Sequence, residues 1–163
     1  MRRAGLVGIL MGLLIASGCT GGSRPPHVGS AAKDFTVGDS DRSVTLSQLR
    51  GKVVILNFWA TWCTPCNEEL PSLMDMQERM RNRGVVVLGV SIDVDNDAYH
   101  RFLKLRNVNF LTVRDPEQKV AAMYGTAGWP ETYIIDRQGV MLRKIIGPIN
   151  WNAPEITQFL SKL

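Results

Sequence analysis

Runs of apolar residues alternate with amphipathic stretches through the middle of the chain. Residues 53–59 (VVILNFW) and 85–92 (VVVLGVSI) are almost continuously apolar and begin with β-branched residues, which is the pattern of strands buried on both faces of a sheet. Residues 65–83 and 96–107 instead repeat apolar side chains at helical spacing. Gly84, which follows an arginine-rich last turn, is a typical helix stop. The middle of the chain therefore predicts two strand–helix units.

The last third of the chain predicts shorter elements. The expected elements are, in order, a strand over 110–113, a helix from Asp115 to about Tyr124, a β-hairpin of strands 132–135 and 140–146, and a helix over 152–163. Alternating strands and helices followed by a hairpin predict an α/β fold. Its central mixed β-sheet would be parallel in the middle with an antiparallel edge, and helices would flank it.

The totals limit the domain count and the classes of partner. The 163 residues, 45% of them apolar, are enough for one core of ordinary size. The net charge of +4 comes from 19 basic and 15 acidic residues that are interleaved along the chain, so a nucleic-acid-binding face is not expected. His27 lies in a predicted linker and His100 has no cysteine or histidine at ligand spacing, so no metal site is predicted.

The first residues have the pattern of an export signal. Arg2 and Arg3 precede an apolar stretch, residues 6–16, that is short for a membrane-spanning helix. Residues 1–18 are therefore predicted to be a signal peptide, with an uncleaved N-terminal anchor helix as the alternative.

The end of this segment resembles a bacterial lipoprotein signal. Small residues precede Cys19, although Ala16 stands where that pattern usually has leucine. The resemblance implies that Cys19 becomes acylated, and several acyl chains would anchor the protein to a membrane outside the cytoplasm. Residues 19–32, rich in Gly, Ser and Pro, then form a flexible linker, and residues 33–163 form the domain.

Cys63 and Cys66 form a CxxC motif where the strand over 53–59 meets the following helix. At that junction the Cys63 sulfur would face unsatisfied backbone N–H groups, which lower a thiol pKa from about 8.5 and make it nucleophilic at neutral pH. Cys66, one turn later, is placed to close a disulfide and to act as the resolving sulfur. Pro65 fits a first helical turn. The motif predicts a redox-active dithiol that needs no further cofactor.

Other functions of a CxxC motif fit this sequence less well. A structural staple is disfavoured because a two-residue ring removes little chain entropy. A structural zinc or iron site needs about four ligands, and the motif supplies two. A copper-delivery protein of the same fold remains an alternative, although it calls for a histidine near the cysteines. A peroxidase would need a Pro-x-x-x-Thr-x-x-Cys arrangement, which residues 60–63 (ATWC) lack.

From about Lys33 onward the chain resembles the TlpA/ResA-type thiol–disulfide oxidoreductases of the thioredoxin superfamily. The match is carried by residues 57–66 (NFWATWCTPC), 69–71 (ELP) and 128–132 (GWPET). It implies a thioredoxin-like fold, protein thiol or disulfide clients, and a redox-active disulfide between the two cysteines of the motif.

The resemblance also implies a substrate-binding surface. The matching proline, Pro130, is cis in the superfamily and packs beside the disulfide. The Trp129 backbone would pair with an extended client segment, as in strand addition. Trp62 and Trp129 would form apolar walls around the sulfurs. A plain core role for either tryptophan is the alternative.

Glu69 is the expected proton acceptor. Cytoplasmic thioredoxins use a buried aspartate where this chain has Asn57, which cannot titrate. The ResA-type branch uses a glutamate after the motif instead, and Glu69 matches it, three residues after Cys66 on the same helical face. A buried carboxylate there would have a raised pKa and could exchange a proton with Cys66. The alternative is an exposed acid at the helix start.

The sequence thus predicts a membrane-anchored, extracytoplasmic thiol–disulfide oxidoreductase that reduces protein disulfides. The family implies recharging by a membrane-embedded thiol reductant, and apocytochrome c as the best-supported client class. The opposite direction, a disulfide donor or isomerase, stays open because Thr64 and Pro65 between the cysteines do not fix the redox potential.

Overall fold

The structure is a computed structural model that describes residues 24–39 and 42–163. The predicted signal peptide over 1–18 and the predicted lipidation site Cys19 lie outside the described residues. Within the described part of the chain, no helix combines the length and the apolar character that crossing a membrane requires.

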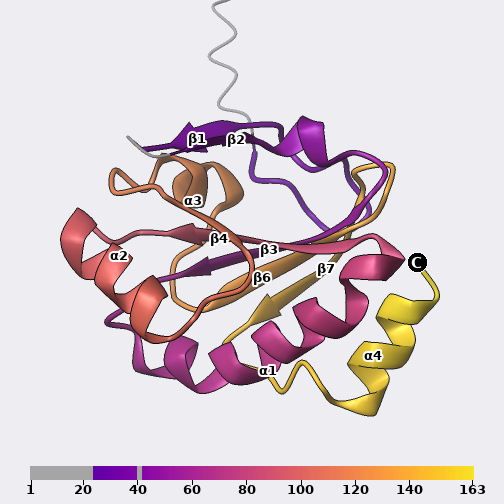
Figure 1. The fold of residues 1–163 in the computed structure, drawn as a ribbon. Helices are drawn as coiled ribbons and strands as arrows, with labels where there is room; N and C mark the ends of the chain where they lie inside the picture. The colour runs from indigo at the N-terminus through magenta and orange to yellow at the C-terminus, as the bar shows by residue number, and fades with distance from the viewer. Residues whose placement is uncertain (1–23, 40–41) are drawn as a thin grey trace, which may run out of the picture.

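A five-stranded mixed sheet forms the centre of the molecule, with the strand order β5-β4-β3-β6-β7 (Figure 1). The strands are β3 (Val53–Trp59), β4 (Val85–Ser91), β5 (Leu111–Arg114), β6 (Glu131–Ile135) and β7 (Met141–Ile146). β3, β4 and β5 run parallel, whereas β6 and β7 run antiparallel to β3 and to each other. The predicted mixed sheet is confirmed, with β3 between its parallel and antiparallel halves.

Helices and a small hairpin cover the two faces of this sheet, as Figure 1 shows. The helices are α1 (Thr64–Met80), α2 (Asn96–Leu105), α3 (Lys119–Tyr124) and α4 (Pro154–Ser161). One face carries α1 and α4, and the other carries α3 together with the hairpin of β1 (Thr36–Gly38) and β2 (Ser43–Thr45). Short 3-10 turns, Leu46–Leu49 and Arg81–Arg83, follow β2 and α1.

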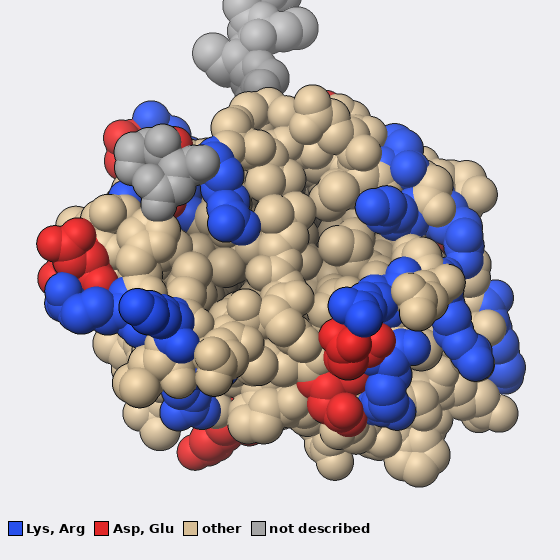
Figure 2. Space-filling model, viewed as in Figure 1, with Lys and Arg blue, Asp and Glu red and all other residues tan. Residues whose placement is uncertain are grey.

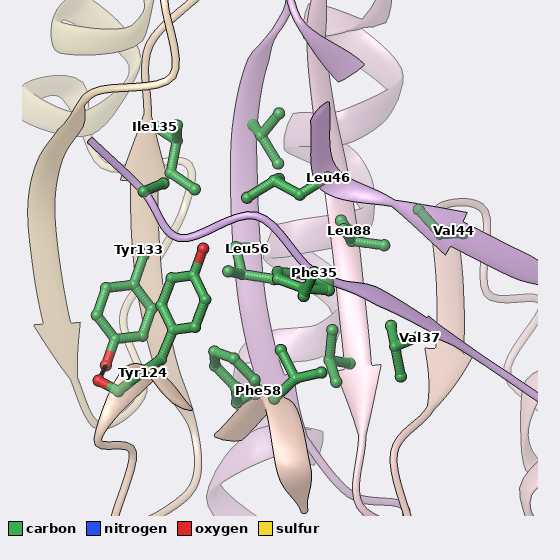
Figure 3. Packing of buried hydrophobic residues seen from close by; sticks show 14 of the residues in the cluster. Phe35, Val37, Val44, Leu46, Leu56, Phe58, Leu88, Tyr124, Tyr133 and Ile135 are labelled. Atoms are coloured by element: carbon green, nitrogen blue, oxygen red, sulfur yellow. Dashed lines mark hydrogen bonds between the residues drawn. The ribbon is translucent and has the colours of Figure 1, made fainter. Parts of the chain in front are cut away.

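The strand β3 is buried along its whole length because its side chains alternate between two hydrophobic clusters. Val53 and Ile55 pack towards α1 and α4, whereas Leu56 and Phe58 pack towards α3 and the β1–β2 hairpin. Figure 3 shows the second cluster, in which Tyr133 donates a hydrogen bond to a backbone carbonyl at 3.0 Å. Burying each such side chain contributes about 1.5–3 kcal/mol, so both faces hold β3 in register.

The helix expected from Asp115 begins later than predicted. Residues 116–118 form a turn, and Gln118 has a positive φ of 56°, so α3 starts at Lys119. The Asp115 carboxylate accepts the N–H groups of Lys119 and Val120 at 3.0 and 2.8 Å and caps the helix from a distance. Asp115 therefore does mark the start of this helix, but α3 is shorter than the sequence pattern predicts.

The chain already contacts the domain before Lys33. The Gly29 N–H donates to the Met141 carbonyl at 2.8 Å, and the Ala32 N–H donates to the Gly139 carbonyl at 2.9 Å. Ala32 is 6% exposed. The end of the stretch predicted as linker therefore lies along the β6–β7 hairpin.

Charged side chains occupy the margins of the face in Figure 2. Lys and Arg gather towards the left and right sides of the view with Asp and Glu among them, and the band between them is largely uncharged. This distribution agrees with the interleaving of charges in the sequence.

Candidate active site

The two cysteines lie where β3 gives way to α1. β3 ends at Trp59, and Cys63 is the N-cap of α1 with extended backbone angles (φ −80°, ψ 105°). Cys63 and Cys66 form a disulfide, with their Cα atoms 5.2 Å apart. The Cys63 sulfur also accepts the Cys66 N–H at 3.2 Å. The sulfur expected at the amino end of the helix is therefore there, in contact with a backbone donor.

Both sulfurs are enclosed. Cys63 is 5% exposed and Cys66 is 3% exposed, so the two cysteines are buried almost equally in the disulfide form. Trp62 stands next to them with 64% of its surface exposed. The disulfide is therefore buried beside an exposed indole.

The segment before β6 also belongs to this site. The Trp129–Pro130 peptide bond is cis, as the resemblance implied. Trp129 is half-buried and packs against the cluster that contains both cysteines. The Gly147 N–H holds the Pro130 carbonyl at 2.9 Å. The structure therefore brings Trp129 and Pro130 to the same end of the sheet as the CxxC motif, although the two segments are far apart in sequence.

Glu69 is buried, so the alternative of an exposed acid is wrong. It is 3% exposed and accepts hydrogen bonds from Asn57 Nδ2 at 2.9 Å, from the Ile149 N–H at 3.3 Å and from Trp151 Nε1 at 3.3 Å. Burial raises the pKa of the Glu69 carboxyl above its ordinary value, and the three donors offset only part of that rise. Glu69 follows Cys66 by one helical turn.

The sequence placed Asn57 at this site only as a residue that cannot titrate, and it did not identify Trp151. Asn57 Nδ2 donates to Glu69 and also to Thr132 Oγ1, each at 2.9 Å, and thereby ties α1, β3 and β6 together. Trp151 is fully buried and reaches Glu69 from the segment before α4. An aromatic residue next to a predicted helix start was the available signal for Trp151, but its partner is 82 residues away.

A groove reaches Glu69 from outside. It has a volume of about 320 Å³ and lies between the start of α1 and the segment 148–150. Its lining includes Glu68 and Glu69 on one side and Pro148 and Ile149 on the other. Glu69 therefore lines a surface groove, although nearly all of its surface is buried.

Ligand-type side chains were compared across the part of the chain that the structure describes. No group of three or more His, Cys, Asp or Glu residues there is placed to hold a metal ion. His100 is half-buried, with its ring centroid 5.1 Å from that of Tyr99.

Three comparisons bear on the identity of the chain. The model of the AhpC/TSA family matches residues 28–144. The thiol-disulfide oxidoreductase ResA of Bacillus subtilis is 33% identical over 147 residues, covering 86% of this chain and 82% of the relative. The thiol:disulfide interchange protein DsbE of Pseudomonas aeruginosa is 36% identical over 116 residues, covering 71% and 62%. A Chlorobium tepidum crystal structure, named as a thiol:disulfide interchange protein DsbE, matches with a TM-score of 0.76 at 31% identity, covering 82% and 94%.

The chain belongs to the AhpC/TSA family. Its similarity to ResA and DsbE proteins, together with the Cys63–Cys66 disulfide, makes it a thiol–disulfide oxidoreductase. The predicted thioredoxin-like fold is confirmed by the mixed five-stranded sheet and by the solved relative.

A second buried glutamate in this AhpC/TSA-family chain follows the cis peptide bond directly. Glu131 is 4% exposed, and its carboxylate accepts from Thr126 Oγ1 at 2.7 Å and from the hydroxyl of Tyr133. Lys144 from β7 lies 3.1 Å from the same oxygen. Glu131 thus connects the segment before Pro130 to β6 and β7. The sequence motif contained Glu131 but gave no sign of its cationic partner.

Proposed function

We propose that the chain is a membrane-anchored, extracytoplasmic protein-disulfide reductase of the ResA type. The observation that carries this proposal is the Cys63 sulfur at the amino end of α1, in a disulfide with Cys66 and beside the exposed Trp62. A thiolate at that position is stabilised by backbone N–H groups and by the helix dipole.

The reducing reaction has two exchange steps. In the reduced protein the Cys63 thiolate attacks one sulfur of a client disulfide, the other client sulfur leaves as a thiolate, and a mixed disulfide forms. The Cys66 thiolate then attacks the Cys63 sulfur, which releases the second client thiolate and closes Cys63–Cys66. Two electrons pass from the protein to the client, and an external thiol reductant restores the dithiol.

Glu69 assists the second step by taking the proton of the Cys66 thiol. A carboxylate with a raised pKa is a better match for a thiol than an ordinary one, and proton transfer is most efficient when the two pKa values are close. The groove beside Glu69 would let that proton leave to water.

Trp62, Trp129 and Pro130 bind the client. The indole of Trp62 offers apolar contact outside the disulfide, and Trp129 packs against the buried cluster that contains both cysteines. The backbone next to the cis proline would pair with an extended client segment. Proteins with reactive cysteine pairs, such as apocytochrome c before haem attachment, are the proposed clients.

Anchoring and recharging complete the proposal. A lipid on Cys19 would hold the domain at a membrane surface outside the cytoplasm, and a membrane-embedded thiol reductant would return the disulfide to the dithiol. The signal peptide and the lipidation of Cys19 are inferred from the sequence pattern. Replacement of Cys19 by serine should release the protein from membranes without changing the chemistry of the purified domain.

Two measurements test the direction and the mechanism. Equilibration of the purified domain with glutathione buffers should give a reduction potential below about −200 mV, and a clearly higher value would contradict a reductase. The Cys66→Ser variant should accumulate a mixed disulfide with client protein through Cys63. The matched Cys63→Ser variant should accumulate none, and equal trapping by both variants would refute the assignment of the attacking sulfur.

A further inference from the structure

The loop that presents Cys63 is anchored by a buried carboxylate from the neighbouring strand. Asp93 lies two residues beyond the end of β4 and is 3% exposed. Its Oδ1 accepts the Thr61 hydroxyl at 2.6 Å, and its Oδ2 accepts the Thr61 N–H at 2.9 Å. The Asp93 carboxylate therefore accepts two hydrogen bonds from Thr61, which lies two positions before the attacking cysteine.

The carboxylate is itself fixed by its own strand. The Ser91 hydroxyl donates to Asp93 Oδ2 at 2.6 Å and accepts the Asp93 N–H at 3.0 Å. Arg114 donates to the backbone carbonyls of Asp93 and Val94 at 3.5 and 3.2 Å. With side chain and backbone both held, Asp93 is a rigid point of attachment for the loop.

The other side of the loop is tied to α1. Asn67 Nδ2 donates to the Thr61 carbonyl at 3.0 Å, and the Asn67 N–H donates to the Cys63 carbonyl at 3.1 Å. The Cys63 N–H in turn donates to the Ala60 carbonyl at 3.2 Å. Thr61 is thus held between β4 and α1, and it cannot shift without breaking bonds on both sides.

These contacts matter most when the disulfide is open. In the oxidised protein the covalent bond itself keeps Cys63 on the first turn of α1. In the dithiol and in the mixed disulfide that restraint is lost, and the loop is then held by its hydrogen bonds and by the packing of Ala60 and Cys63. A small displacement of the reacting atom is enough to slow a reaction strongly.

We propose that Asp93 is a positioning residue for the redox reaction: by holding Thr61 it keeps the Cys63 sulfur at the amino end of α1 while the disulfide is open. The inference rests on the proposed function in one respect, namely that Cys63 is the attacking sulfur. Asp93 touches neither sulfur in the contacts described, and it acts through the loop.

The test measures iodoacetamide alkylation of Cys63 in the reduced full-length protein as a function of pH, with peptide mapping to identify the modified cysteine. The Thr61→Val variant keeps the shape of the side chain and loses the hydroxyl donor. Its Cys63 should react about fivefold more slowly at pH 6, with the midpoint of the pH profile moved upward, because a displaced sulfur loses its backbone donor. Thr61→Ser restores the hydroxyl and should restore the wild-type profile.

Two further variants separate positioning from other roles. Ser91→Ala removes one of the bonds that fix the Asp93 carboxylate but leaves both bonds between Asp93 and Thr61, so it should slow Cys63 less than Thr61→Val does. Asp93→Asn removes a negative charge, which by electrostatics alone would make Cys63 more acidic and faster to react; positioning instead predicts slower reaction. Thermal unfolding confirms that each variant is folded at the assay temperature.

The outcomes are distinguishable. A wild-type profile for Thr61→Val, or a faster reaction in Asp93→Asn, would overturn the positioning role. Modification of Cys66 before Cys63 in the unsubstituted protein would instead contradict the proposed function, whatever the variants do.

Discussion

Glu69 and Glu131 are buried carboxylates that approach the same end of the sheet from opposite faces. Thr132 and Glu131 are neighbours in β6, so their side chains point to opposite sides. Thr132 shares Asn57 with Glu69 on the α1 side, whereas Glu131 joins Tyr133 on the side of α3. The two glutamates are therefore buried to a similar extent and both belong to motif segments, 69–71 and 128–132, but their surroundings differ.

The difference lies in the partners. Glu69 is held by two neutral side chains and one backbone N–H, and it lines a groove. Glu131 faces the ammonium of Lys144. Partial burial alone would lower the pKa of Lys144, but its hydrogen bonds with Glu131 and Tyr133 raise the pKa instead, so this cation stays charged at neutral pH. Glu69 therefore has only neutral donors around its carboxylate, whereas the carboxylate of Glu131 is paired with a cation.

The largest expected effect separates the two glutamates by kinetics. Glu69→Gln should slow the resolution of the mixed disulfide by about 100-fold at pH 7, because the acceptor for the Cys66 proton is gone. Glu131→Gln should slow the same step much less. Stopped-flow release of a fluorescent client thiol measures the rate of resolution. Equal decreases of that rate in both variants would contradict a special role for Glu69.

The second effect is on stability. Lys144→Met leaves the Glu131 carboxylate buried without its cation and should lower the free energy of unfolding by about 2 kcal/mol, less than for a fully buried pair because Lys144 is one-third exposed. The matched control is Lys119→Met, which breaks the exposed pair with Glu117 and should not change stability measurably. Urea denaturation compares them, and similar midpoints for both variants would contradict the argument.

A smaller effect concerns the donors of Glu69. Trp151→Phe keeps most of the aromatic surface but removes the indole N–H, which should cost about 1 kcal/mol of unfolding free energy. The pKa of Glu69 should also rise further, and the pH profile of resolution should move with it. Trp62→Phe is the control because that indole is exposed, and its stability should match wild type.

The pH dependence of stability gives the finest comparison. The folded-state pKa of Glu69 is raised, so the folded protein binds its proton more tightly than the unfolded chain does. Wild type should therefore lose stability relative to Glu69→Gln as the pH rises from the unfolded pKa, about 4.3, through the raised folded pKa, and the difference should level off above it. Urea midpoints across this range test the sign, and a difference that grows in the other direction would refute it.

The sequence predicted the elements that carry strong periodic patterns. β3 has the expected bounds, Val53–Trp59, because a continuous apolar run flanked by turn signals leaves few other structures. β1 and β2 were not predicted, since three-residue strands have too little pattern to recognise. The start of α3 was misplaced because Asp115 caps it across a turn.

The active site was predictable where the chemistry is local, and at Trp129 and Pro130 where a family motif indicated a distant segment. Only two residues separate Cys63 from Cys66, and the position of Glu69 three residues after Cys66 indicated that the two side chains share a helical face. Asp93 and Lys144 reach the site from other strands, and contacts of this kind depend on tertiary packing that no local pattern records. The lipid on Cys19 stays a prediction, since that residue lies outside the described chain.

If Cys19 carries a lipid as proposed, the pairing of residues 29–32 with the β6–β7 hairpin limits how far the domain can lie from the membrane. Because the backbone is held from Gly29 onward, a lipid on Cys19 would be joined to the domain by ten residue steps at most. A fully extended chain of that length spans about 35 Å, comparable to the width of a small domain. The disulfide would then stay within a thin layer above the lipid surface. The anchor would therefore select clients by their location as much as by their shape.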